Sequence, residues 1–133
     1  MKRKTFVMLA AGGIAAFCLP EFSCKTKSNS FIKTLALPQA LQHISDAKTI
    51  REIGEAYKKQ NQNESDETIL VKLLSIDKHG KPIPEASGSI TVASLLDEKI
   101  RDDFQQNKTM IVDGWVLSVT EARQCALFSI TEK

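Results

Sequence analysis

The dipeptide Asp113-Gly114 is the feature that most constrains the fold of this chain, because it lies between two runs of β-prone residues. Both central positions of a tight two-residue turn need a positive φ, which Asp and Gly tolerate. The flanking runs are Met110-Ile-Val112 and Trp115-Val-Leu117. Together they predict a β-hairpin over about residues 109–118. An isolated hairpin is only marginally stable in water, so the rest of the chain must support it.

A helix is predicted directly after the hairpin. Ser118 and Glu121 have the spacing of a capping box, in which the hydroxyl and the carboxylate each accept a hydrogen bond from a backbone N–H at the start of a helix. We therefore expect the helix to begin at Val119. Its expected core face consists of Val119, Ala122, Ala126 and Ile130, with Cys125 and Phe128 beside it.

Four further helices are indicated upstream by capping residues and apolar periodicity. Pro38 fits the first position of a short helix that runs to about Ile44. Ser45-Asp46 and Ser65-Asp66 each cap a later helix, and another begins near Thr91 or Ser94 and ends near Asn107. The expected core faces are Ile50, Ile53, Ala56 and Tyr57 in the second helix; Ile69, Leu70, Leu73 and Leu74 in the third; and Leu96, Ile100 and Phe104 in the fourth.

The expected fold class is therefore mainly α, a small bundle of four to five short helices with one β-hairpin before the C-terminal helix. The predicted domain organisation is an export signal over residues 1–23, a polar tether over 24–36 and a small helical domain over 37–133. Residues 77–89 contain two prolines and two glycines without periodicity, and we interpret them as a connecting loop.

The first 23 residues have the pattern of an export signal. Lys2, Arg3 and Lys4 form a basic head, and the next 15 residues, 5–19, are uncharged and mostly apolar. A run of that length is short of the roughly 20 residues that span a bilayer. The other interpretation, a buried N-terminal helix, does not explain the basic head or the Pro-Glu-Phe-Ser-Cys that follows.

The export route has two alternatives. Arg3-Lys4-Thr5-Phe6-Val7 resembles a twin-arginine signal, except that Lys4 replaces the second arginine. The general secretory route is the other alternative, and the sequence leaves both open.

Cys24 is a candidate lipidation site, because it follows Ser23 and precedes a polar run, as in bacterial lipoproteins. Two acyl chains would hold the protein firmly on a membrane. The alternative is a disulfide between Cys24 and Cys125 in an oxidising compartment. We favour lipidation, because Cys125 falls on or beside the apolar side of its helix.

The basic excess of the chain belongs to the signal. Three of the 18 basic residues and one of the 16 acidic residues lie within residues 1–23, so the remainder carries 15 of each and has no net charge. A neutral domain without a basic stripe gives no basis for nucleic-acid binding.

The reactive side chains form no catalytic or metal-binding pattern. The two histidines, His43 and His79, have no second histidine at helical spacing, and no Cys-x-x-Cys occurs. We therefore expect no metal, no cofactor and no catalytic activity of the chain's own. The acidic pairs Asp97-Glu98 and Asp102-Asp103 are expected to be solvated on a helix.

One cluster is a possible interaction surface. Asp113, Trp115, Glu121 and Arg123 fall around the hairpin and the first turn of the last helix, and Trp and Arg are enriched at binding hot spots. In the alternative interpretation, Trp115 packs beneath the ribbon, Glu121 caps the helix and Arg123 forms an ion pair nearby.

Two segments carry a resemblance: Ile53-Gly-Glu-Ala-Tyr57, and the run from Asp113 to Leu127 that contains Asp-Gly-Trp-Val-Leu-Ser-Val-Thr-Glu-Ala-Arg. With the leader, they resemble a group of small exported bacterial proteins of largely uncharacterised role. Some small exported proteins with such leaders are similar in size and layout to accessory subunits of periplasmic sugar or alcohol dehydrogenases, which travel with a flavoprotein partner.

Two functions follow as expectations. The first is an exported, lipid-anchored, non-catalytic interaction or accessory module of the bacterial cell envelope, on the periplasmic or outer face of a membrane. The second, favoured by the twin-arginine-like segment because that route carries folded and often cofactor-loaded proteins, is an accessory subunit that binds a larger exported flavoprotein.

Overall fold

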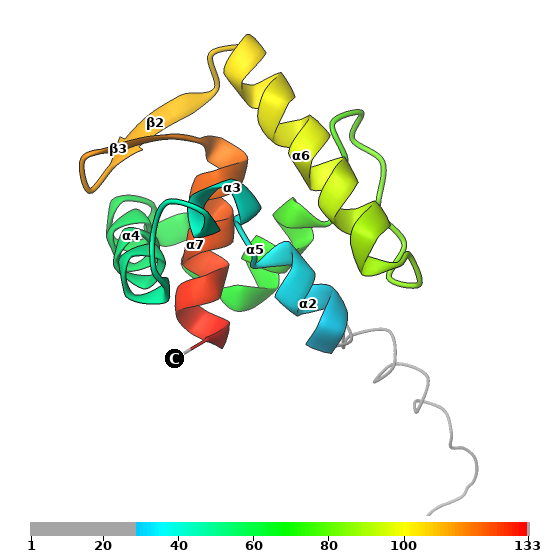
Figure 1. Cartoon of the computed structure of the whole chain (residues 1–133), viewed down its shortest axis with the longest axis horizontal. Helices are drawn as coiled ribbons and strands as arrows, with labels where there is room; N and C mark the ends of the chain where they lie inside the picture. The colour runs from blue at the N-terminus through cyan, green and yellow to red at the C-terminus, as the bar shows by residue number, and fades with distance from the viewer. Residues whose placement is uncertain (1–28, 133) are drawn as a thin grey trace, which may run out of the picture.

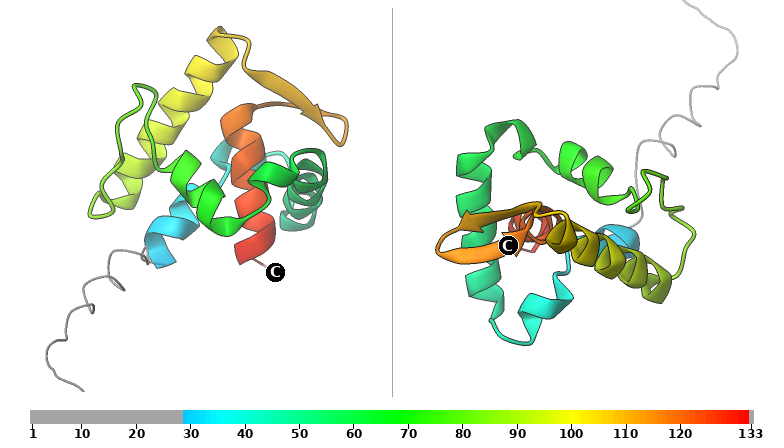
Figure 2. Two further views of the ribbon diagram at one scale, coloured as in Figure 1. Left: turned by 180° about the vertical axis from the view of Figure 1, so that it is seen from behind. Right: turned by 90° about the horizontal axis from the view of Figure 1, so that it is seen from above.

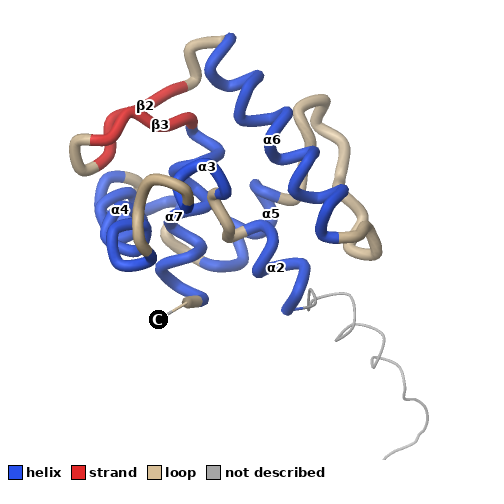
Figure 3. The backbone as a smooth tube through the Cα atoms, viewed as in Figure 1, coloured by secondary structure: helices blue, strands red, loops and turns tan. Residues whose placement is uncertain are grey.

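The computed structural model describes residues 29–132, which form a mainly helical domain with a two-stranded antiparallel ribbon before the last helix (Figures 1 and 3). The expected fold class is confirmed. The elements are α2 (Asn29–Leu35), α3 (Gln39–Gln42), α4 (Ala47–Gln60), the 3₁₀-helix η2 (Gln62–Glu64), α5 (Glu67–Leu74), α6 (Ser89–Gln105), β2 (Thr109–Val112), β3 (Trp115–Ser118) and α7 (Val119–Thr131). The predicted leader and Cys24 lie outside the described residues.

Helix α7 is the centre of the domain, with α2, α4, α5, α6 and the ribbon around it (Figure 2). It begins at Val119 as predicted, but the predicted single core face was wrong. Nine consecutive or near-consecutive positions between Thr120 and Ser129 are buried, whereas Val119 and Ile130 are only half-buried. A helix enclosed on most sides buries small and polar residues that periodicity assigns to solvent.

The α4 backbone lies unusually close to that of α7. Gly54 of α4 faces the α7 backbone so closely that an added Cβ would lie 2.1 Å from the carbonyl oxygen of Cys125 and 2.9 Å from the Cβ of Ser129. Ile50, Ile53 and Tyr57 pack on the same side of α4 and are almost completely buried. Glycine thus permits the contact that joins the two helices.

The ribbon forms in the predicted register. Asp113 and Gly114 have φ values of 52° and 84°, as a two-residue hairpin turn requires, and Val112 pairs with Trp115. Side chains alternate between its two faces: Val112 and Leu117 are buried in the core, whereas the cross-strand partners Ile111 and Val116 are exposed.

The first backbone N–H groups of α7 all have acceptors. The Ser118–Glu121 capping box is present as predicted. In addition, the Val119 N–H donates to the carbonyl of Lys108 (3.1 Å), and the Thr120 N–H donates to a carboxylate oxygen of Asp103 (3.0 Å). The expectation that Asp103 is solvated was wrong, because it is buried as a cap supplied by α6.

Other boundaries and core faces also differ from expectation. The predicted tether over 24–36 does not hold for its second part, because α2 begins at Asn29 and buries Phe31 and Leu35 in the core. In α5, Val71 is buried instead of Ile69, which is 41% exposed. Helix α6 begins at Ser89, and Phe104 is 45% exposed because the adjacent Asp103 faces α7.

The loop between α5 and α6 is held at three points. The Asp77 carboxylate accepts hydrogen bonds from the backbone N–H groups of His79 (2.8 Å) and Lys81 (3.0 Å). Ile76 and Pro82 form an isolated β-bridge, and Ile83 is buried in the core. The loop is therefore a packed connection with an internal turn.

Replacing Gly54 with alanine tests the α4–α7 contact. The new methyl group would overlap a backbone carbonyl that has no side-chain freedom to move, so we expect Gly54→Ala to lower the free energy of unfolding by about 3 kcal/mol. Gly88→Ala is the matched control, since nothing lies within 4 Å of its added Cβ. Urea unfolding measures both variants, and equal effects would contradict the close contact.

Candidate functional site

The four residues of the predicted interaction surface do not share one surface. Asp113 is exposed at the hairpin turn, and Trp115 is half-buried on the core side of the ribbon. Glu121 is 6% exposed, and its carboxylate accepts the Ser118 N–H at 3.1 Å. Arg123 binds Glu64 (2.8 Å) near the end of α4. The structure thus brings Asp113 and Trp115 together on the ribbon and gives Glu121 and Arg123 structural contacts.

A shallow depression lies between the hairpin turn and the outer side of α4. Its volume is about 410 Å³, and Asp113 contributes to it from the turn. The α4 residues that line it are Lys48, Arg51, Glu52, Glu55, Ala56 and Lys59. This wall carries both signs of charge, so it suits a polar partner surface better than a small apolar ligand.

Ile111 and Val116 form an exposed apolar pair on the outer face of the ribbon. They are 67% and 64% exposed and lie directly opposite each other across the two strands. The same strands are joined by Asp113, which lines the depression. We call the depression and this pair together the ribbon surface. Sequence analysis missed the pair, although alternation with the inward-facing Val112 and Leu117 predicts it.

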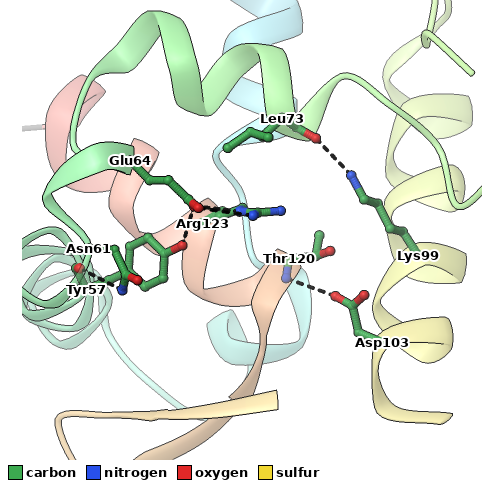
Figure 4. A network of polar contacts seen from close by, with 8 residues as sticks. All are labelled: Tyr57, Asn61, Glu64, Leu73, Lys99, Asp103, Thr120 and Arg123. Carbon is green, nitrogen blue, oxygen red and sulfur yellow. Dashed lines mark hydrogen bonds and ion pairs between the residues drawn. The ribbon is translucent and has the colours of Figure 1, made fainter. Parts of the chain in front are cut away.

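A polar network joins α4, η2 and α7 (Figure 4). The Tyr57 hydroxyl donates to Glu64, and Arg123 binds the same carboxylate through Nε (2.8 Å) and Nη2 (3.3 Å). The hydrogen bond from Arg123 holds the pKa of Glu64 below its ordinary value. Burial, together with the hydrogen bond to Glu64, raises the pKa of Tyr57 to about 12.

Lys99 extends from α6 to the end of α5. Its ammonium donates to the carbonyl oxygens of Leu73 (2.9 Å) and Ile76 (2.8 Å), as Figure 4 shows for Leu73. Burial lowers the pKa of Lys99, and the positive charge of Arg123 lowers it further. This side chain therefore caps the C-terminal carbonyls of α5.

Cys125 lies in the core of α7. It is fully buried with a free thiol, and burial raises its pKa to about 12. A thiol with that pKa remains protonated at neutral pH, so Cys125 acts as a small apolar side chain here.

Comparison with protein-family models, with curated proteins and with solved structures finds no match. Within residues 29–132, no group of three or more His, Cys, Asp or Glu side chains could hold a metal ion. No helix in this part of the chain combines the length and apolar character needed to cross a membrane.

The single tyrosine of the chain reports directly on the polar network. We expect its tyrosinate absorbance at 295 nm to titrate near pH 12 in the folded protein and near its ordinary value of 10.0 in urea. Glu64→Gln should move the folded midpoint toward 10, because it removes a carboxylate that favours the protonated phenol. Burial, the largest cause, prevents a complete return.

The exposed Glu67 of α5 supplies the matched control. Glu67→Gln should leave the midpoint unchanged, and a Glu64→Gln midpoint that stays near 12 would contradict the network. Since the folded pKa of Tyr57 lies above the unfolded one, the network contributes stability below pH 10 that is lost as the pH rises through about 12.

Proposed function

We propose that this protein is an exported, lipid-anchored interaction module of the bacterial cell envelope with no catalytic activity of its own. The exposed pair Ile111 and Val116 on the ribbon is the observation that carries this proposal. Aliphatic residues facing each other on an unpaired ribbon gain free energy when a partner covers them. The turn of the same ribbon carries Asp113, which lines the charged depression along α4 and offers polar contacts to the same partner.

The lipid anchor in this proposal is Cys24. Helix α2 begins at Asn29, five residues later in the sequence. Five residues span at most roughly 17 Å when fully extended, so a lipid on Cys24 would keep the domain close to the membrane. The partner would then be a protein at or in the same membrane, or one delivered to it.

The second candidate function is an accessory subunit of an exported flavin-dependent sugar or alcohol dehydrogenase. The observation in its favour is the twin-arginine-like segment at Arg3 and Lys4, since that route exports folded, cofactor-loaded proteins. The ribbon surface would be the docking site for the flavoprotein. The two candidates differ in what binds, not in where it binds.

The anchor is tested by Cys24→Ala in the expressing cell. Removal of the acylated thiol should move the protein from the membrane to the soluble fraction, as followed by fractionation and immunoblotting, because a lone domain of this size has no other proposed anchor. Mass spectrometry of the wild-type protein should show a cleaved, acylated Cys24. A cleaved Cys24→Ala protein that stays on the membrane would overturn the lipid anchor.

The ribbon surface is tested by the double variant Ile111→Thr/Val116→Thr. Threonine keeps the β-branched shape that strands favour but removes apolar area, so the hairpin should persist while a bound partner is lost. The measurement is gentle purification from solubilised membranes, with mass spectrometry for stoichiometric partners and absorbance for flavin.

Ile90→Thr is the control, because Ile90 is 85% exposed at the start of α6, outside the ribbon. A partner that remains with the double variant would exclude the ribbon surface. A flavin-containing partner lost only from the double variant would select the dehydrogenase subunit over the general interaction module.

A further inference from the structure

The outer edge of β2 carries backbone groups that the ribbon itself leaves unpaired. The Val119 N–H donates to the carbonyl oxygen of Lys108 at 3.1 Å, so these two residues continue the antiparallel ladder as a hydrogen-bonded pair. Hydrogen-bonded and non-hydrogen-bonded pairs alternate along such a ladder. Thr109 and Ile111 fall at the non-hydrogen-bonded positions, and their N–H and C=O groups therefore point away from β3.

This edge is open among the described residues. No backbone hydrogen bond joins Thr109 or Ile111 to another element within residues 29–132, and both residues are exposed. Figures 1 and 2 show the ribbon at the margin of the domain, with α4 and α7 beside it. The opposite edge, on β3, is partly occupied because the Ser118 N–H donates to Glu121.

The edge of β2 also lacks the features that protect edge strands from pairing. Thr109–Val112 contains no charged residue and no proline, and its register with β3 is continuous, without a bulge. The exposed residues at its two ends, Lys108 and Asp113, have opposite charges. Two such edges in antiparallel orientation bring Lys108 of each copy to the end where the other copy has Asp113, whereas parallel orientation brings like charges together.

We propose that β2 pairs antiparallel with β2 of a second copy of this chain, so that the two ribbons form one four-stranded sheet. Met110 of each copy lies at the two-fold axis, and Thr109 of each copy lies opposite Ile111 of the other. The outward N–H and C=O groups of these residues then form hydrogen-bonded pairs across the axis.

A second copy suits this edge better than an unrelated peptide, because the same four residues supply both members of each pair and both signs of charge are present at the ends. The two-fold axis is perpendicular to the sheet, so the exposed Ile111 and Val116 of both copies lie on one face. The pairing itself uses only the edge of β2, and it requires neither the lipid anchor nor a partner on that face.

Proline substitution tests the edge. Ile111→Pro removes an outward N–H, while the hydrogen bonds to β3 come from Met110 and Val112 and are retained. Val116→Pro is the matched control, because it makes the same change on the outer edge of β3. A strand of four residues buries less area than the roughly 1,200 Å² of a standard interface, so we expect a dimer with a Kd on the order of micromolar.

Sedimentation equilibrium of the full-length protein in a mild detergent measures this dimer over about 1 μM to 1 mM. Ile111→Pro should weaken dimerisation by roughly tenfold or more, and Val116→Pro should leave it unchanged. A wild-type protein that stays monomeric over this range would overturn the proposal, as would equal dimerisation of the two variants.

Cysteine cross-linking tests the register without a risk to the hairpin. In the proposed sheet, Met110→Cys places two thiols opposite each other at a non-hydrogen-bonded pair, with Cα atoms about 4.5 Å apart, which a disulfide can join. Ile111→Cys places them diagonally, about 7–8 Å apart, which is beyond that range.

Under mild oxidation, Met110→Cys should therefore form a disulfide-linked dimer much faster than Ile111→Cys. The unsubstituted protein gives the background from its own cysteines, of which Cys125 is buried. Faster cross-linking of Ile111→Cys, or no Met110→Cys dimer above the background, would overturn the pairing.

Discussion

The close contact between α4 and α7 is the constraint on which the rest of the domain depends. With Gly54 against the Cys125 carbonyl, the two backbones meet without an intervening side chain. The flanking residues Ile53 and Tyr57 then reach the core on either side. Because α7 is held so tightly on this side, the remaining elements pack around its other sides, which explains why nearly every position of that helix is buried.

Helix α6 packs on another side of α7, and two of its charged side chains bind backbone groups at the ends of neighbouring helices. Asp103 accepts a backbone N–H at the start of α7, and Lys99, one turn earlier, donates to carbonyls at the end of α5. An anion at a helix N-terminus and a cation at a helix C-terminus are both favoured by the helix dipole. These two charged side chains thereby help to hold α6, whose Val92 and Leu96 are also buried in the core.

The features of this fold that depend on contacts between neighbouring residues were predictable from the sequence. Those that depend on contacts between distant residues were not. Asp113-Gly114 and the pair Ser118 and Glu121 determine their turn and cap within a few residues, so sequence alone identifies them. The partner of Asp103 lies 17 residues away, and nothing local distinguishes it from a solvated carboxylate. The same limit applies to Phe104, because a regular apolar spacing predicts a face but not how far along the helix its neighbours extend.

The candidate site was also only partly predictable from the sequence. Trp115 and Arg123 were predicted to lie on an interaction surface because of their residue types. In the structure, however, Arg123 forms an ion pair with Glu64. Ile111 is chemically unremarkable in the sequence, and only the ribbon register shows that it faces solvent. Residue type therefore pointed to side chains that form structural contacts within the fold. The exposed side chains that a partner could contact were identifiable only from the strand register.

Side chains whose contacts stabilise the fold can be distinguished in this domain from side chains that lack such contacts. The half-buried Lys99 and the buried Asp103 and Glu121 bind backbone atoms at helix ends, so the fold itself accounts for them. The exposed apolar pair on the ribbon and the Gln124 oxygen have no such account among the described residues. An exposed aliphatic pair and a buried acceptor are unfavourable for opposite reasons, and each becomes favourable when something binds. They also lie on different elements, the first on β2 and β3 and the second on α7.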